Sequence, residues 1–131
     1  MSIRSELEKI ILTWAATQSI PVSIENIPFN KPNNSKYVEV YFLGSSTICP
    51  TVNGKRERET GIMQVNCCVP QGNGAKAGED LADAIKALFP VVPKVGTVSI
   101  ERPANISQAL YRDDGFRVIP VRVSYRAERS L

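Results

Sequence analysis

The spacing of apolar residues changes along this chain between steps of three or four, which indicate a helix, and steps of two, which indicate a strand. Helical spacing occurs twice, over about 3–17 and over 77–88. Pro21 and Pro90 follow these two segments, and proline cannot continue a helix. The sequence therefore predicts two amphipathic helices, one near the start of the chain and one in its second half.

Alternating segments lie between and after the helices, and they are rich in β-branched and aromatic residues. The predicted strands are 22–24, 37–43, 61–69, 97–102 and 116–127. This order predicts an α+β fold with a mostly antiparallel sheet and both helices packed on one face. Pro120 has no N–H to donate to a ladder, so the last strand is expected at a sheet edge or with a bulge.

The segment 44–60 is expected to form a long hairpin or loop between two of the strands. Its Asn-Gly pair is a strong tight-turn signal, and an alternating run of charges follows the pair. Such charges can set the register with a neighbouring subunit, and the alternative is a solvated rim without a partner. The predicted contact loop consists of Asn53, Gly54, Lys55, Arg56, Glu57, Arg58 and Glu59.

Length and charge narrow the class of protein. A chain of 131 residues fits one domain, spanning 1–131, and no stretch approaches the roughly 20 apolar residues that cross a bilayer. The net charge of +3 is too small to indicate nucleic-acid binding by itself. Cys49, Cys67 and Cys68 are expected to be reduced thiols, because adjacent strand residues point to opposite faces and cannot easily form a disulfide with each other.

The sequence contains few groups that could carry catalysis. It has no histidine, the most common general acid-base group near neutral pH. The cysteines lack a CxxC pair, and Gly72 and Gly74 precede a helix without the Lys-Ser/Thr ending of a phosphate-binding loop. Paired carboxylates fall on predicted exposed helix faces or in a turn. We therefore predict no catalytic residue, no metal site and no cofactor, and a protein that is not an enzyme.

Five segments together cover nearly the whole chain: SELEKIILTWAA, IENIPFNKP, YVEVYFL, GIMQVNCCVPQGNGAKAGEDLADAIKALFP and RVIPVRVSYRA. The most telling is the strand that ends at Val69 and Pro70, with its two glycines and the helix that stops at Phe89. In these segments the chain resembles the tail terminators of phages with long, non-contractile tails. The resemblance is one of pattern and includes no catalytic motif.

The resemblance implies a structural virion protein that caps the tail tube as a hexameric ring, ends tube growth and provides a surface for head attachment. Its implied partners are copies of itself, the tail tube protein and head-tail connector proteins, with DNA only passing through the lumen and no membrane. The implied location is the head-proximal end of the virion tail, after synthesis in the host cytoplasm. Arg117, Arg122 and Arg126 are the basic residues expected at the lumen or at an interface.

Two other functions stay open at this point. The first is a head-tail connector or neck protein, which differs from a terminator in its partner. The second is a nucleic-acid-binding module in which Tyr37 and Tyr41 stack on bases beside the arginines of the sheet.

Overall fold

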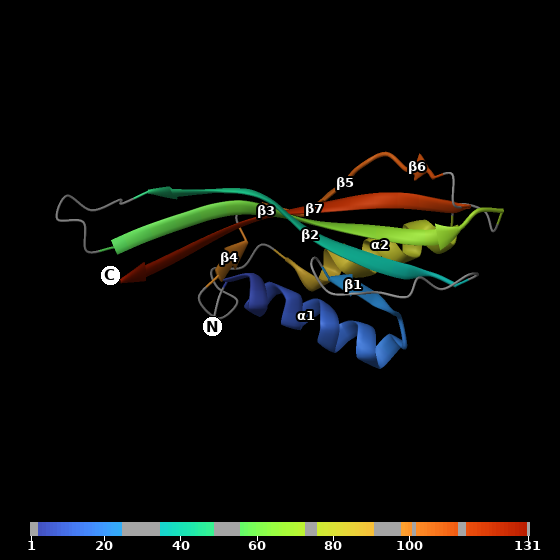
Figure 1. The fold of residues 1–131 in the computed structure, drawn as a ribbon, viewed down its shortest axis with the longest axis horizontal. Coiled ribbons are helices and arrows are strands. Elements are labelled where there is room, and N and C mark those ends of the chain that lie inside the picture. Colours follow the sequence, from blue (N-terminus) through green and yellow to red (C-terminus); the bar gives the residue numbers. More distant parts are fainter. Residues whose placement is uncertain are drawn as a thin grey trace.

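The computed structural model describes residues 3–24, 35–48, 56–72, 76–90, 98–100, 102–112 and 115–130. It contains a seven-stranded sheet with two helices on the same side (Figure 1). The helices are α1 (Ile3–Gln18) and α2 (Lys76–Leu88). The strands are β1 (Val22–Ile24), β2 (Tyr37–Ile48), β3 (Arg56–Pro70), β4 (Val98–Ile100), β5 (Asn105–Ile106), β6 (Leu110–Tyr111) and β7 (Phe116–Ser130). The predicted α+β class is confirmed.

The strand order is β1-β2-β3-β7-β4, with the short strands β5 and β6 also paired to β7. Only the β1–β2 pairing in this described sheet is parallel, and the others are antiparallel. Neither described helix has the length and apolar composition needed to cross a bilayer.

The main core lies between the sheet and the helices. Both helices contribute their apolar stripes, represented by Leu7 and Ile11 in α1 and by Leu81 and Ile85 in α2, all at most 4% exposed. The three long strands contribute alternate residues, which are Val38, Val40, Met63, Val65, Cys67, Val69, Ile119, Val121, Val123 and Tyr125. We call this the helix side of the sheet and the opposite surface the open face.

The three long strands continue past the helices as an arm (Figure 1). The arm consists of residues 45–48, 56–60 and 126–130, and its strands stay in antiparallel register to Ile48↔Arg58 and Arg56↔Ser130. A register shift between Leu43 and Ser45 marks a bulge at Gly44. The strands are therefore longer than predicted, and residues 44–48 and 56–60 belong to the ladder. The tip of the expected hairpin, 49–55, lies outside the described residues.

The prediction for Pro120 was wrong. Strand β7 lies inside the sheet, and its register with β3 runs without a shift through Asn66↔Pro120. The carbonyl of Pro120 accepts a hydrogen bond from Ser107 N at 2.8 Å, so the backbone polar groups of Pro120 face the side away from β3. An N–H at this position would point toward the break between β5 and β6. Its absence therefore costs no ladder hydrogen bond among the described strands.

Candidate interaction surface

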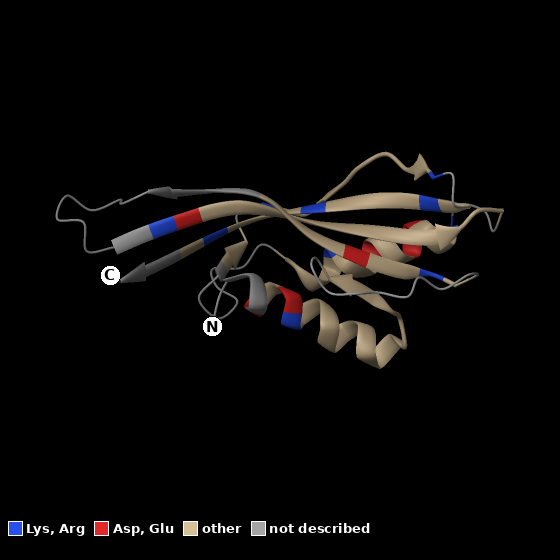
Figure 2. Cartoon of the chain, viewed as in Figure 1, with Lys and Arg blue, Asp and Glu red and all other residues tan. Residues whose placement is uncertain are grey.

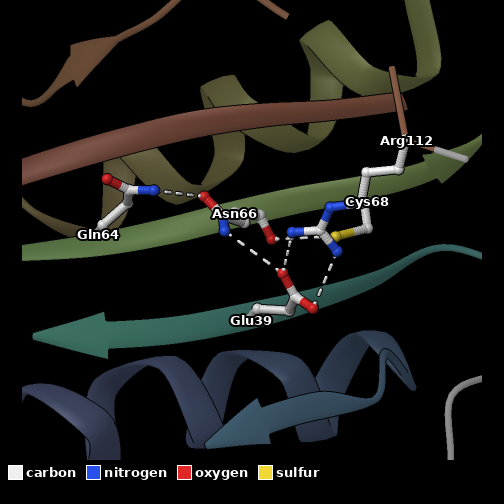
Figure 3. A network of polar contacts seen from close by, with 5 residues as sticks. All are labelled: Glu39, Gln64, Asn66, Cys68 and Arg112. Atoms are coloured by element: carbon white, nitrogen blue, oxygen red, sulfur yellow. Dashed lines mark hydrogen bonds and ion pairs between the residues drawn. The ribbon is translucent and has the colours of Figure 1, made fainter. Parts of the chain in front are cut away.

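An ion pair crosses the open face of the sheet (Figure 3). Arg112, just before β7, donates from Nη2 to Glu39 Oε1 at 2.6 Å and from Nη1 to Oε2 at 3.1 Å. The side chain of Glu39 is 13% exposed and that of Arg112 is 34% exposed. These two hydrogen bonds tie the segment before β7 to β2, across the intervening strand β3.

Hydrogen bonds extend this ion pair along the open face. Asn66 donates to Glu39 Oε1 at 3.3 Å and accepts from Gln64 Nε2 at 2.8 Å. Gln64 in turn accepts from Arg122 Nε at 3.1 Å. The 6% exposed side chain of Asn66 is thus satisfied, and a continuous polar network runs across β2, β3 and β7 from Arg112 to Arg122.

A second, smaller apolar cluster lies on the open face beside this network. It contains Tyr37, Cys68, Phe116 and Val118, with the Tyr37 and Phe116 rings edge to face at a centroid distance of 5.1 Å. Burial, followed by the charge of Glu39, raises the pKa of Cys68 to about 12. Burial and the neighbouring Cys68 raise the pKa of Cys67 to about 12 as well. Both thiols therefore stay protonated at neutral pH and are poor nucleophiles.

The two cysteines point to opposite faces, as the sequence predicts. Cys67 lies in the main core and Cys68 in the small cluster. Among the residues that the structure describes, no group of three or more His, Cys, Asp or Glu side chains could hold a metal ion.

The predicted basic trio does not form one cluster. Arg122 and Arg126 both lie on the open face of β7, with Ser124 between them on that face. They are opposite Gln64 and Thr60 of β3. Arg117 belongs to the helix side, where its Nη1 lies against the backbone of Gly78 in α2. That Nη1 is buried and has no hydrogen-bond partner in the described part of the chain.

The predicted contact loop falls into two parts. Asn53, Gly54 and Lys55 lie outside the described residues, and Arg56, Glu57, Arg58 and Glu59 form the start of β3. The register places Glu57 opposite Arg129 and Arg58 opposite Glu128 of β7. The alternating charges therefore have complementary positions within their own sheet, a relationship that spacing along the sequence could not reveal.

Exposed apolar side chains form two groups that the sequence analysis missed. Of the seven large apolar side chains exposed in the described residues, six fall in these groups, and Leu12 of α1 stands apart. The open-face patch consists of Tyr41, Leu43 and Ile62, and the edge patch of Ile106, Leu110 and Tyr111 on the short strands β5 and β6. Within the edge patch, Leu110 pairs with Val118 on the open face, whereas Ile106 and Tyr111 pair with helix-side residues of β7. An available signal for the first patch was the apolar residues on the second face of the 37–43 strand.

A cavity of about 350 Å³ adjoins the edge patch, between α2 and the β5–β6 segment. Ile106, Ala109 and Ile119 provide apolar walls. Glu79 and Asp83 line the α2 side, and Arg117 of β7 lines the cavity as well. Figure 2 shows acidic residues on α2 and basic residues along β7. The cavity beside the edge patch thus carries charges of both signs, and the open face carries Arg122 and Arg126.

The described surface carries exposed apolar side chains of the kind that contact other proteins. The chain belongs to the phage tail terminator family, because the family model described as phage tail terminator protein matches residues 2–125. It is therefore a structural protein of phage tails. The resemblance predicted from the sequence is confirmed.

Two solved structures share the fold. One, which carries no description of function, is 30% identical, with 95% of this chain and 92% of that chain covered and a TM-score of 0.74. The other is a chain from the virion of a native gene transfer agent particle, 12% identical, with 98% and 96% covered and a TM-score of 0.68. The comparison with curated proteins gives no significant match.

Proposed function

We propose that this chain caps the tail tube as a ring, ends tube growth and provides the surface to which the head attaches. The observation that carries the proposal is the match of the tail terminator family to residues 2–125, which leaves almost no part of the chain for another role. A similar fold in a gene transfer agent virion, matched over nearly its whole length, supports a place in a particle.

The shape of the chain supports ring formation. A closed ring needs two different surfaces on each copy, because each copy contacts its neighbours head to tail. The chain has two separate apolar patches, and its arm extends past the helical layer (Figure 1). We propose a hexamer whose further partners are the tail tube protein and the head-tail connector proteins, at the head-proximal end of the tail.

The proposed lumen carries DNA without binding a particular sequence. Arg122 and Arg126 share the open face and are the candidates for a basic surface toward DNA or toward a neighbour. Arg117 is a weaker candidate for the lumen, because its guanidinium packs against α2 on the other side of the sheet.

The structure removes one of the two tyrosines that a nucleic-acid-binding module would use to stack on bases. Tyr37 is 1% exposed and packs against Phe116, so its ring cannot stack on a base. Tyr41 remains at the surface, at 36% exposure. A connector role, in contrast, needs the same kind of contact surface as a terminator and is the second candidate.

Electron microscopy of particles made without this chain tests the proposal. The expected result is tails of uncontrolled length that are not joined to heads, restored to normal by supplying the wild-type chain. Tails of normal length that fail only to join heads would support the connector role and contradict the terminator role. Normal, complete particles would contradict both.

A further inference from the structure

One buried donor of the sheet has no acceptor. Nη1 of Arg117 is buried and makes no hydrogen bond with the residues that the structure describes. The absence of a side chain at Gly78 makes room for it, since a Cβ there would lie 3.0 Å from this nitrogen. Buried donors in folded proteins are nearly always paired, so an acceptor for Arg117 is expected from outside the described residues.

The guanidinium of Arg117 lines the cavity between α2 and the β5–β6 segment. The other walls are mostly apolar and include Ile106, Ala109 and Ile119. The volume of about 350 Å³ lies in the range of about 300–1,000 Å³ that is typical of ligand pockets. An apolar side chain can therefore enter the cavity and bring an acceptor oxygen to Arg117.

Charges of both signs lie in this cavity, at different depths. Glu79 and Asp83 are exposed and one helical turn apart on α2, whereas Nη1 of Arg117 is buried. A free anion would meet the two carboxylates at the mouth, and a free cation would meet the guanidinium beneath them. The cavity therefore suits a polypeptide segment that brings a neutral carbonyl to the guanidinium and keeps a basic side chain at the mouth.

The chain has a segment of this chemistry at the end of its own arm. Residues 49–55 (CPTVNGK), called the tip segment below, join β2 to β3 and lie outside the described residues. Their sequence contains one aliphatic side chain, Val52, and one basic side chain, Lys55, with peptide carbonyls between them. The tip segment thus has the three groups that the cavity can receive.

The tip segment cannot reach the cavity of its own copy. Figure 1 shows the arm and β6 at opposite ends of the molecule, and Arg117 and Ser130 lie at opposite ends of β7. A strand of 15 residues is roughly 50 Å long, whereas a segment the length of 49–55 spans at most about 25 Å. A second copy must provide the cavity. Such a contact joins two different surfaces, and repeated around an axis it closes a ring.

We propose that the tip segment of one copy inserts into the α2–β5 cavity of the next copy. Val52 packs on the apolar walls, a backbone carbonyl of the tip segment accepts a hydrogen bond from Arg117 Nη1, and Lys55 faces the two carboxylates of α2. The apolar side chain and the carbonyl provide the affinity, and Lys55 sets the register. This inference rests on the proposed ring and names the surfaces that form it.

Two blocked variants test this contact. Val52→Ser with Lys55→Ser removes both side chains of the tip segment, and Ala109→Phe fills the cavity from its wall. Circular dichroism and thermal melting check that both variants fold. Leu12→Ser, which shortens an exposed side chain of α1, is the control for the tip variant. Leu110→Phe, which enlarges the exposed neighbour of Ala109, is the control for the cavity variant.

Sedimentation at up to about 1 mM, which reaches weak contacts, gives the readout. The wild type and both controls are expected to self-associate, and each blocked variant is expected to weaken self-association at least tenfold. An equimolar mixture of the two blocked variants should form a one-to-one dimer that grows no further, because one intact tip and one intact cavity remain. Self-association of either blocked variant at the wild-type level, a mixture without dimers, or a wild type that stays monomeric would overturn the proposed contact.

Replacing Arg117 separates a contact role from a structural one. Because its Nη1 has no partner in the described chain, Arg117→Met is not expected to lower the melting temperature. Self-association of the folded variant should nevertheless weaken about tenfold, because the carbonyl of the inserted segment loses its donor. Self-association at the wild-type level would overturn the proposed hydrogen bond, whatever the melting temperature.

A charge exchange tests the register. Lys55→Glu and Asp83→Lys are each expected to weaken self-association about tenfold, because like charges then face each other. Both changes on one chain should restore it to within about threefold, since every contact of the ring then contains the reversed pair. Asp80→Lys, an exposed reversal on α2 outside the cavity lining, is the control. Additive losses in the double variant would overturn the proposed register.

These outcomes separate the contact from the proposed function. If the variants show no such contact but particles without the chain still have tails of uncontrolled length, the capping role stands and this interface falls. If the contact is found but tail length does not depend on the chain, the interface stands and the capping role falls.

Discussion

Arg112 reaches across β3 to hold Glu39 of β2 with two hydrogen bonds, although the two residues are 73 positions apart in the sequence. The pair lies on the same face as Cys68, which belongs to the small cluster with Tyr37, Phe116 and Val118 (Figure 3). The hydrogen bonds that Arg112 donates to Glu39 also raise the pKa of the Arg112 guanidinium above its ordinary value. The open face is therefore organised by one contact between distant parts of the chain.

Removing Arg112 should destabilise the fold more than removing an exposed arginine. Arg112→Met is expected to lower the free energy of unfolding by about 1–2 kcal/mol, because it leaves the mostly buried Glu39 carboxylate without its charged partner. Arg122→Met, which breaks one exposed hydrogen bond to a neutral amide, should cost about 0.5 kcal/mol. Urea unfolding of the purified chain measures both values, and equal losses would contradict the structural role of the ion pair.

Gly78 leaves little room for a Cβ while Ile119 keeps its full side chain. An added Cβ would lie 2.7 Å from Ile119 Cδ1 and 3.0 Å from Arg117 Nη1. Gly78→Ala should therefore lower the free energy of unfolding by about 1 kcal/mol, because the overpacking costs more than the gain in helix propensity returns. In a chain with Ile119→Val, which lacks that Cδ1, the same change should be neutral or stabilising. Thermal melts of the four chains measure this coupling, and an unchanged cost of Gly78→Ala would contradict it.

The buried thiols should make the fold sensitive to alkali. The pKa values of Cys67 and Cys68 are about 12 in the folded chain and about 8.5 when a thiol is exposed. Between these values the unfolded state has lost protons that the folded state keeps, so stability falls as pH rises. The slope should approach about 2.7 kcal/mol per pH unit for two thiols.

Denaturation at pH 8 to 11 measures this slope, and the variant Cys67→Ala with Cys68→Ala should flatten it. A thiol reagent at pH 8 should modify neither residue in the folded chain and both in urea. Rapid modification of either thiol in the folded chain would show that the site is open and would contradict the raised pKa values.

Opposite charges at facing positions of β3 and β7 should stabilise the arm. Glu128→Arg places a like charge directly opposite Arg58 and is expected to cost about 0.5 kcal/mol locally. Adding Arg58→Glu should recover most of that loss, because the opposite charges are then exchanged. Hydrogen exchange of the amides of 56–60 reports the local change. Equal protection in all three chains would contradict a stabilising pairing of these charges within the sheet.

Local patterns predicted the elements that bury one face against the core. The helices, the alternation of 61–69 and the opposite directions of Cys67 and Cys68 follow from spacing alone, because each element must place its apolar residues on one side. The short strands β5 and β6 have too few residues for a periodicity, and they form because β7 offers them a partner.

The candidate surface was less predictable for a related reason. The sequence identifies Arg117, Arg122 and Arg126 as basic but does not show that β7 divides them between two faces. The partner of Arg112 is set by sheet order and by the turn before β7, which no local signal contains. The prediction for Pro120 was wrong because it assumed an unbroken ladder on both sides of the strand, whereas the edge next to Pro120 is broken there.

The most direct test of the central claim is the growth of purified tail tube protein with and without this chain. One ring per tube end should stop elongation, so a small fraction of the chain relative to tube protein should shorten the tubes seen by electron microscopy and leave their number unchanged. Tubes that grow to the same length at every ratio, or that shorten only when the chain equals the tube protein in amount, would contradict a cap at the tube end.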